Sequence, residues 1–366
     1  MTADRFAARR HKLLRKIGSA EAEALLITNF TNVTYLTGFS GDDSYLLVGK
    51  DQTVLISDSR YSLQIQEECP GLEFCIRTSQ QPILEATARV VKRAKLRKVG
   101  FESHATTFAQ WDSLTDKIKP LELVPLPRLV EELRLIKDQH EITAIREAVR
   151  QADRGFRVMR ASLLPTMTEL EVAHDLEHMM RRFGARAAGF APIVAVGARS
   201  ALPHARPTGG RLLEAGFVLV DWGAVNAAGY KSDLTRVLVT GRISPKLAKI
   251  YRVVLNAQRR GIKAIRPGAR CRDVDAVARS VIAEAGYRKN FGHGLGHGLG
   301  LDVHEGPRLN QTSKDVLKPG MVVTVEPGIY LPGWGGVRIE DDILVTRDGC
   351  EVLTSVPKDF EEVILF

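Results

Sequence analysis

FVLVDWGAVNAAGYKSDLTRVLV, residues 217–239, joins two apolar runs through a glycine-containing turn. This pattern predicts a β-hairpin. Asp221 ends the first apolar run and Asp233 begins the second, so the two carboxylates can face each other across the hairpin. A single Asp at the end of a strand is more often a turn residue. A functional role for this pair therefore depends on further acidic residues in similar positions.

Two more carboxylates fall within apolar runs later in the chain. Glu326 lies in VVTVEPGIY, where Pro327 and Gly328 end the run, and Glu340 lies in GVRIEDDILV. Burying a carboxylate in such a run costs several kcal/mol unless a partner compensates it, and carboxylates brought together repel each other. A pair of divalent cations would resolve both problems, because hard cations bind carboxylate oxygens and one carboxylate can bridge two metals.

The stretch FGHGLGHGLGLDVHEGPR, residues 291–308, places His293, His297 and His304 among glycines. It is either a flexible linker or a metal-ligand segment whose glycines leave room for substrate and backbone near a crowded site. Asp and Glu ligands with one imidazole favour Mn, Co, Zn or Fe over Ca. Two such metals roughly 3.5 Å apart can hold a bridging hydroxide, which suits amide hydrolysis. A serine or cysteine nucleophile is not indicated, because GxSxG is absent.

The 366 residues predict two or three domains of ordinary globular composition, with 44% apolar and 26% charged residues. No apolar run reaches about 18 residues, so no membrane span is expected. The N-terminus lacks the apolar core of a secretory signal. The four cysteines form no CxxC pair. We therefore expect a cytoplasmic protein with reduced thiols.

The net charge of +9 raises the possibility of nucleic-acid binding. The basic residues gather in KRAKLRK, residues 92–98, and in a stripe of Arg146, Arg150, Arg154 and Arg157 at helical spacing. Neither group is interleaved with the aromatic residues that stack on bases. Solvated faces or a subunit contact are the preferred interpretation, and no nucleic-acid partner is expected.

Residues 1–127 predict an α/β domain. Helical patterns at 5–18 and 81–94 accompany short apolar strands, which are EALLIT, YLLVG, TVLIS and KVGFE. VPLPRL, residues 124–129, marks a proline-punctuated domain edge.

Residues 128–366 predict an α+β domain. Helical patterns cover 130–160, 168–184, 245–265 and 272–286, with Thr168 capping the second helix and Gly184 ending it. The predicted strands are PIVAVG, FVLVDWGAV, SDLTRVLVTG, VVTVEPGIYL and GVRIEDDILVT. The repeated order of helices and strands hints at an internal duplication.

The five metal-binding candidates, in this order along the chain, resemble the ligands of the pita-bread metallopeptidases, the M24 family of aminopeptidase P, prolidase and methionine aminopeptidase. They are Asp221, Asp233, His297, Glu326 and Glu340. The motifs TNVTYLTGFSG and ISDSRYSLQ resemble the small creatinase-like N-terminal domain of the aminopeptidase P and prolidase branch. The resemblance covers nearly the whole chain. It implies a pita-bread catalytic domain after the N-terminal domain.

The resemblance also implies a role for each site residue. Asp221 would chelate one metal, Asp233 and Glu340 would bridge both, and His297 and Glu326 would hold the other. Glu326 would in addition shuttle a proton. Four further residues match the family's substrate pocket: His204 near the scissile bond, His304 at the tetrahedral intermediate, His293 in the pocket wall, and Arg338 as the residue that orients the carboxylates. The stretch from Asp221 to Asp233 is one residue longer than in much of the family, which could lengthen the turn or add a bulge.

The implied activity is hydrolysis of the Xaa-Pro bond at the N-terminus of peptides or in dipeptides, with two divalent metals, most often Mn²⁺. Aminopeptidase P and dipeptidase specificities stay open, because a dipeptidase needs a basic group for the substrate carboxylate. The family also predicts a homodimer. The alternative is a metal-free relative that binds peptides or proteins, or a creatinase-like hydrolase. Such a relative would have lost ligands, whereas all five are present here.

Overall fold

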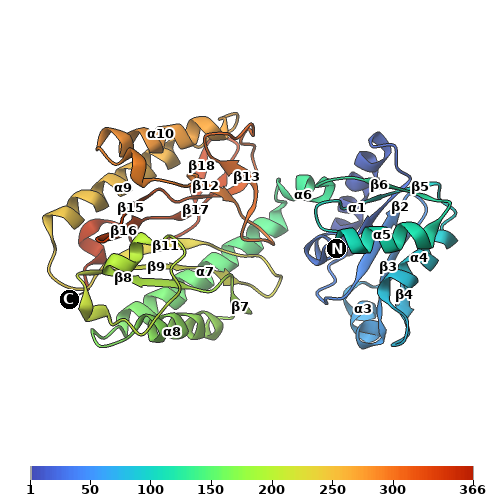
Figure 1. Ribbon diagram of the computed structural model, residues 1–366, viewed down its shortest axis with the longest axis horizontal. Coiled ribbons are helices and arrows are strands. Elements are labelled where there is room, and N and C mark those ends of the chain that lie inside the picture. The colour runs from blue at the N-terminus through green and yellow to red at the C-terminus, as the bar shows by residue number, and fades with distance from the viewer. Residues whose placement is uncertain (1, 366) are drawn as a thin grey trace. The chain divides into compact units, whose positions relative to one another are not determined.

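The computed structural model describes residues 2–365 and divides into two compact units, residues 1–134 and 135–366 (Figure 1). The division falls after helix α6 (Leu129–Arg134), which belongs to the first unit. The boundary expected after residue 127 therefore lies one short helix earlier than this division. Within residues 2–365, no helix is both long enough and apolar enough to cross a bilayer.

The first unit is built on a six-stranded sheet of order β4-β3-β2-β1-β5-β6. β2 pairs antiparallel with β1 and β3, and the other pairs are parallel. The strands are β1 (Ala24–Ile27), β2 (Tyr45–Gly49), β3 (Thr53–Asp58), β4 (Glu73–Arg77), β5 (Lys98–Phe101) and β6 (Glu122–Pro125). The helices before α6 are α1 (Thr2–Ser19), α2 (Phe30–Thr37), α3 (Ser62–Glu68), α4 (Ile83–Arg93) and α5 (Phe108–Ile118), with a 3-10 turn η1 (Ser59–Tyr61). The predicted combination of helices and a sheet is confirmed, and α2, α3, α5, β4 and β6 are additions to it.

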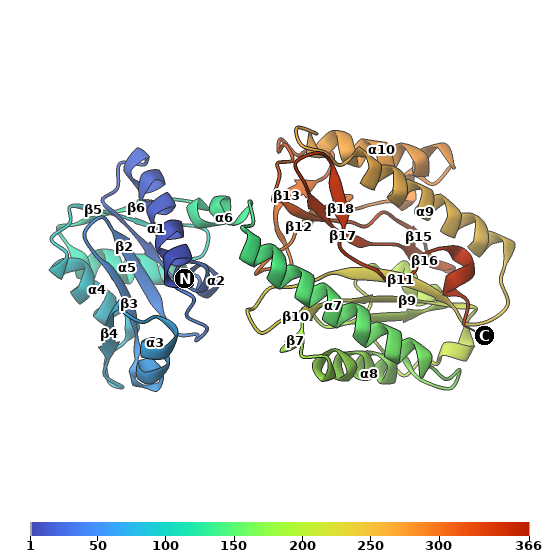
Figure 2. The ribbon, with the colours of Figure 1, turned by 180° about the vertical axis from the view of Figure 1, so that it is seen from behind.

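Four long helices surround the strands of the second unit in two pairs, α7 with α8 and α9 with α10 (Figures 1 and 2). They are α7 (Gln139–Ala161), α8 (Glu169–Arg182), α9 (Pro245–Ala264) and α10 (Cys271–Glu284). Short 3-10 turns are η2 (Gly197–Ala201), η3 (Leu212–Glu214), η4 (Arg288–Asn290) and η5 (Phe360–Val363).

The prediction of a single helix over residues 130–160 is wrong. This segment forms two helices, α6 and α7, because the side chain of Asp138 accepts from the backbone N–H groups of His140 and Glu141 and starts a new helix there. The predicted limits of α8 are confirmed. Thr168 caps its N-terminus, and Gly184 follows its end with a φ of 94°.

The strands of the second unit form four sheets. A three-stranded sheet has the order β11-β9-β8, a five-stranded sheet the order β13-β12-β14-β17-β18, and β15-β16 and β10-β7 form two-stranded sheets. The strands are β7 (Ala187–Ala188), β8 (Ile193–Val196), β9 (Phe217–Trp222), β10 (Ala224–Val225), β11 (Leu234–Val239), β12 (Gly296–Gly298), β13 (Glu305–Leu309), β14 (Val322–Val325), β15 (Gly328–Leu331), β16 (Gly335–Arg338), β17 (Asp341–Val345) and β18 (Cys350–Val352).

Glu326 and Glu340 lie where the chain changes from one sheet to another. VVTVEPGIYL is divided into β14 and β15, and GVRIEDDILVT into β16 and β17. Each glutamate stands at the division, after β14 or before β17. Pro327 explains the first division, because it has no N–H to donate to a continued ladder. Glu340 therefore lies at a strand junction, not inside a continuous strand as its flanking residues suggest.

The hairpin of β9 and β11 runs in continuous register. Phe217 pairs with Val239, Asp221 with Thr235, and the bridge between Val225 and Lys231 keeps the same alignment beyond β9. The hairpin thus contains no bulge, and the turn lies between Val225 and Lys231. Its backbone is closed by a bond from the Asn226 N–H to the Tyr230 carbonyl. Of the two effects expected of a longer segment, the structure shows no bulge, so any added length lies in the turn.

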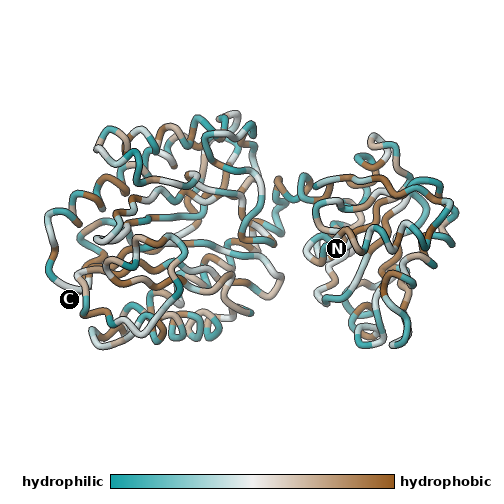
Figure 3. The backbone as a smooth tube through the Cα atoms, in the orientation of Figure 1, coloured by the Kyte–Doolittle hydropathy of each residue, from teal (hydrophilic) through white to brown (hydrophobic). Residues whose placement is uncertain are grey.

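Apolar packing holds the hairpin against α7. The ring of Trp222 is buried and stacks on Phe156 with centroids 4.0 Å apart, and its Nε1 donates to the carbonyl oxygen of Ala152 at 3.2 Å. Figure 3 shows apolar stretches along the inner strands of this unit, whereas polar residues are frequent on the surrounding helices. An aromatic pair of this kind adds about 1 kcal/mol beyond its buried area.

The arginine stripe predicted on one helix lies on α7 and contacts its own unit. Arg146 forms two bonds with Glu351, at 2.5 and 2.6 Å. Arg157 donates to the Ser355 carbonyl oxygen at 2.6 Å, and the guanidinium of Arg154 lies 4.7 Å from the centre of the Phe183 ring. Three of the four arginines thus bind other parts of the second unit.

Candidate metal centre

The structure brings all nine predicted site residues to one cavity of about 920 Å³ in the second unit. They come from separate elements: the β9–β11 hairpin, the loop after η2, the histidine-rich segment that contains β12, and the two strand junctions. They are His204, Asp221, Asp233, His293, His297, His304, Glu326, Arg338 and Glu340. The histidine-rich stretch is therefore part of the folded core and not a linker.

Asp233, His297 and Glu340 form the centre of this group. One ligand atom from each lies within 4.8 Å of the others, and all three residues are buried. His297 Nε2 lies 3.7 Å from Asp233 Oδ2 and 3.3 Å from Glu326 Oε1. The Nδ1 atom of His297 is 3.0 Å from the Gly298 carbonyl oxygen, a contact that leaves Nε2 directed at the carboxylates.

Asp221 stands beside this centre with one oxygen satisfied and one without a partner. Arg338 Nη2 donates to Asp221 Oδ2 at 2.6 Å. Asp221 Oδ1 is buried and has no hydrogen-bond partner. A buried oxygen of this kind normally has a donor or an ion. The donor set of four carboxylates and one imidazole fits divalent cations. A bound cation would give Asp221 Oδ1 the partner that it lacks.

The electrostatics of the protein without metal also indicate missing positive charge. Burial, then the negative charges of Glu340 and Asp221, raises the pKa of Asp233 well above its usual range. Burial and the charge of Glu326 do the same to the pKa of Glu340. Burial raises the pKa of Asp221 against the opposing effect of Arg338. For each residue, burial and the repulsion between carboxylates disfavour the charged form, and bound cations would offset both effects.

Glu326 behaves differently from the other carboxylates. Burial raises its pKa, but the contact with His297 and the charges of His297, His293 and Arg338 outweigh burial and hold that pKa at about 2. Its side chain is also more exposed than that of Asp233, at 17% against 7%. Glu326 is thus ionised at neutral pH and reaches the cavity, as a group that accepts a proton must.

Three hydroxyl groups bond to the predicted site residues, and the sequence pattern does not single them out. Thr235 Oγ1 donates to Glu340 Oε2 at 2.6 Å, and Thr324 Oγ1 donates to Glu326 Oε1 at 3.2 Å. The hydroxyl of Tyr330 lies 2.9 Å from His293 Nε2 and 2.7 Å from Arg338 Nη1. Thr235 could have been found from the hairpin register, because it faces Asp221. Tyr330 gives no such signal, because only the change of sheet after Glu326 brings it to the cavity.

The remaining histidines occupy different parts of the cavity. His293 is half-buried, and burial lowers its pKa. The centroids of the His304 and His297 rings lie 4.5 Å apart, and His304 is exposed on the cavity side. Partial burial of its ring lowers the pKa of His304 as well. His204 is exposed in the loop that follows η2. These positions place three imidazole rings along the cavity around the carboxylate cluster.

The glycines beside His297 are required by the backbone around them. A Cβ atom at Gly296 would lie 2.0 Å from the Thr324 carbonyl oxygen, and one at Gly298 would lie 1.8 Å from the Gly306 carbonyl oxygen. These two glycines therefore leave room for the backbone of neighbouring segments, as one part of the expectation states. Neither glycine's missing side chain creates the space for substrate.

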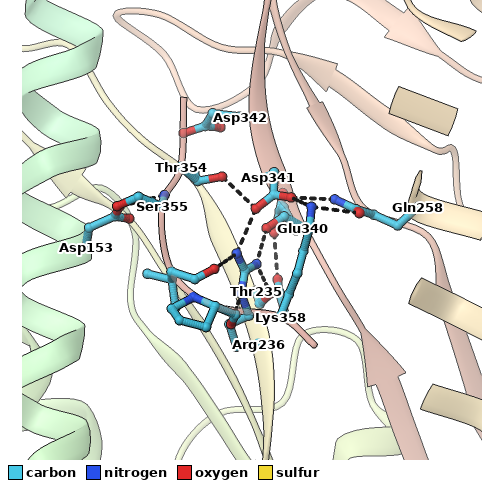
Figure 4. Close-up of polar contacts among 12 residues, drawn as sticks. Asp153, Thr235, Arg236, Gln258, Glu340, Asp341, Asp342, Thr354, Ser355 and Lys358 are labelled. Carbon is cyan, nitrogen blue, oxygen red and sulfur yellow. Dashed lines mark hydrogen bonds and ion pairs between the residues drawn. The ribbon is translucent and has the colours of Figure 1, made fainter. Parts of the chain in front are cut away.

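Asp341 and Asp342 follow Glu340 in the sequence. Asp342 Oδ2 accepts from the backbone N–H of Asp233 at 3.0 Å, whereas Asp341 belongs to a buried network of polar side chains beside Glu340 (Figure 4). Asp341 accepts from Arg236 Nη2 at 2.7 Å, from Gln258 Nε2 at 2.6 Å, and from Lys358. Arg236 also donates to the Glu340 carbonyl oxygen at 2.6 Å. This buried ion-pair network, through Arg236, holds the backbone at Glu340 in place.

Two family models match the chain in succession. The Creatinase/Prolidase N-terminal domain matches residues 9–136, and Metallopeptidase family M24 matches residues 143–347. The chain belongs to metallopeptidase family M24. The predicted creatinase-like N-terminal domain followed by a pita-bread catalytic domain is thereby confirmed.

Relatives in the M24 family match over nearly their full length. An uncharacterised peptidase, YqhT, of Bacillus subtilis is 42% identical over 349 residues, which are 95% of this chain and 98% of that protein. An Xaa-Pro dipeptidase of Pyrococcus horikoshii is 34% identical over 351 residues, 95% and 97% of the two chains.

Solved structures of M24 proteins agree with this fold. An Xaa-Pro dipeptidase from Bacillus anthracis superposes with a TM-score of 0.93 at 41% identity, over 98% of this chain and 100% of that one. An X-Pro aminopeptidase from Thermotoga maritima superposes with a TM-score of 0.87 at 33% identity, over 95% and 98%. Similar M24 structures thus include both a dipeptidase and an aminopeptidase.

Proposed function

We propose that this chain is a dinuclear metal-dependent exopeptidase that cleaves the Xaa-Pro bond. The observation that carries the proposal is the cluster of Asp221, Asp233, Glu326 and Glu340 with His297 on one cavity. These five residues would hold two divalent cations, and Mn²⁺ is the first choice with Co, Zn or Fe as alternatives. Asp233 and Glu340 are the proposed bridging ligands, because burial and then the charges of neighbouring carboxylates raise the pKa of each.

The cations, when bound, activate water and polarise the scissile carbonyl. The other steps belong to side chains of the chain. Glu326, ionised at neutral pH, accepts the proton of the attacking water and delivers it to the leaving prolyl nitrogen. His304, exposed to the cavity beside His297, donates a hydrogen bond to the oxyanion. Arg338 and Thr235 hold the carboxylates in place through the contacts described above.

Within this activity we propose a preference for dipeptides. Lys289, Arg206 and Arg308 are cavity-lining cations with exposed side chains. A dipeptide carries its free carboxylate one residue beyond the scissile bond, and a guanidinium can bind it with two hydrogen bonds. A longer peptide has a neutral amide at that point. The Xaa-Pro dipeptidases among the relatives support the same preference.

The test of the mechanism is Glu326→Gln, which keeps an oxygen for metal but cannot accept the proton. Proline release from Ala-Pro should fall by at least about 100-fold, and bound metal, measured by elemental analysis, should remain. Full activity in this variant would contradict the mechanism. A wild-type protein that binds no Mn, Co, Zn or Fe would instead favour the metal-free peptide-binding alternative. The homodimer and cytoplasmic location stay predictions.

A further inference from the structure

The loop of residues 197–208 forms one wall of the cavity and is fixed at both of its ends. It follows β8 and contains η2, and its residues 203–207 line the cavity, including His204 and Arg206. Five consecutive residues outside a helix or strand would ordinarily be mobile. The position of His204 therefore depends on what holds this loop.

Glu169, the first residue of α8, holds the two ends of the loop together. Its side chain is fully buried. Oε1 accepts from the Val196 N–H at 2.8 Å, just before the loop, and Oε2 accepts from the Thr208 N–H at 2.8 Å and from Thr208 Oγ1 at 2.7 Å. One carboxylate thus closes the loop across its base.

Arg199, which lies in η2, extends this connection to the segment that lines the cavity. Its Nε lies 3.1 Å from both carboxylate oxygens of Glu169, and its Nη2 donates to the Arg206 carbonyl oxygen at 2.6 Å. On the opposite side, Arg338 Nη2 lies 3.3 Å from the Pro203 carbonyl oxygen. The segment 203–207 is therefore held between Arg199 and the arginine that binds Asp221.

Helix α8 does not need the Glu169 carboxylate for its own cap. Thr168 and Glu171 form a complete capping box at its N-terminus. A fully buried carboxylate costs several kcal/mol unless its oxygens are bonded, and these bonds go to loop 197–208 and its flank. The burial of Glu169 is thus explained by the loop.

We propose that Glu169 and Arg199 are positioning residues that set His204 and Arg206 against the substrate. This inference rests on the proposed peptidase function, because it assigns the two residues to the same site. Among the residues that the structure describes, neither Glu169 nor Arg199 belongs to the cavity lining. Their effect would reach the substrate through the backbone of residues 203–207, where a misplacement of about 1 Å can cost on the order of 100-fold in rate.

The test compares Arg199→Ala with Arg181→Ala. Arg181 is a matched control, because it also pairs with a glutamate of α8, Glu177, at 2.9 Å and donates to the backbone carbonyl of Arg186 at 2.8 Å. Arg186 does not line the cavity, whereas Arg206, which Arg199 holds, does. Arg199→Ala should lower kcat/KM for Ala-Pro about tenfold or more with unchanged bound metal. Arg181→Ala should leave it unchanged. Arg199→Lys, which keeps a cation beside Glu169, should recover part of the loss.

Hydrogen exchange of the metal-free protein gives a second readout that is independent of activity. Amides of residues 196–208 should exchange faster in Arg199→Ala and in Glu169→Gln, while those of α7 and α9 keep wild-type protection. Wild-type kcat/KM in Arg199→Ala would overturn the proposal, as would a uniform loss of protection throughout the second unit. If Glu169→Gln does not fold, Arg199→Ala decides alone. An inactive wild-type protein would defeat the proposed function, and the exchange data would still test the clamp on the loop.

Discussion

Asp221 and Thr235 stand opposite each other in the β9–β11 ladder, and their side chains bind the same arginine. Arg338 donates from Nη2 to Asp221 Oδ2 at 2.6 Å and from Nε to Thr235 Oγ1 at 3.0 Å. The Thr235 hydroxyl in turn donates to Glu340 Oε2 at 2.6 Å. One pair of facing residues therefore links two proposed ligands from distant parts of the chain.

The first prediction concerns this link. Thr235→Val keeps the shape of the side chain but removes the hydroxyl, which leaves Glu340 Oε2 and Arg338 Nε each without one bond. We expect metal affinity to fall about 10- to 100-fold, and the free energy of unfolding to fall by about 1–3 kcal/mol. Metal titration followed by calorimetry measures the first effect. Thr235→Ser keeps the hydroxyl and should stay near wild type; equal affinity in all three proteins would exclude this role of Thr235.

The second prediction concerns the pH dependence of stability without metal. The pKa of Asp233 is raised well above its usual range in the folded state by burial and by Glu340 and Asp221, whereas in the unfolded chain it is about 3.9. Between these two pKa values only the folded state keeps the proton, so this residue's contribution makes stability fall as pH rises through that window.

Asp233→Asn removes this contribution. The difference in unfolding free energy between the variant and the wild type should therefore shift in favour of the variant as pH rises from about 4. Added Mn²⁺ should stabilise the wild type increasingly toward neutral pH, because metal replaces the proton. Urea unfolding at a series of pH values checks both trends. A difference that does not vary with pH would show that Asp233 is ionised in the metal-free fold.

The third prediction concerns substrate length. Arg308→Met removes a cavity-lining cation but keeps an unbranched apolar side chain. We expect KM for Ala-Pro to rise about tenfold or more, since a bond to a charged group contributes roughly 1.5–3 kcal/mol. KM for Ala-Pro amide, which has no carboxylate, should change little. Steady-state kinetics on this substrate pair give the comparison. Equal changes for both substrates would place the carboxylate elsewhere, and Arg206→Met and Lys289→Met then identify the alternative cation.

Much of the candidate site could be predicted from the sequence, because its chemistry shows locally. A carboxylate within an apolar run, such as Glu326 in VVTVEPGIY, is costly to bury without a compensating partner, and this cost indicates a functional site. The hairpin around Asp221 and Asp233 follows from alternation and a glycine turn. Thr168 and Gly184 mark the ends of α8 through ordinary capping.

Other features could not be predicted, because they depend on packing between distant segments. The junction at Glu340 exists because β16 pairs with β15 whereas β17 pairs with β14, and nothing within GVRIEDDILV signals that change of partner. Tyr330 contacts His293, and Glu169 contacts Val196 and Thr208, across at least 27 residues of sequence. The break at Asp138 is not evident from the apolar spacing, which continues across it, although Asp138 and Glu141 have the spacing of a capping box.

Hydrolysis of Xaa-Pro bonds by this chain, as we propose it, requires metal held by the carboxylate and histidine cluster. The most direct measurement is release of free proline from Ala-Pro by protein stripped of metal with a chelator, before and after addition of Mn²⁺. We expect no release from the stripped protein, recovery on addition of Mn²⁺, and no recovery in His297→Ala. Proline release that persists without metal, or that no divalent metal restores in the folded wild type, would contradict it.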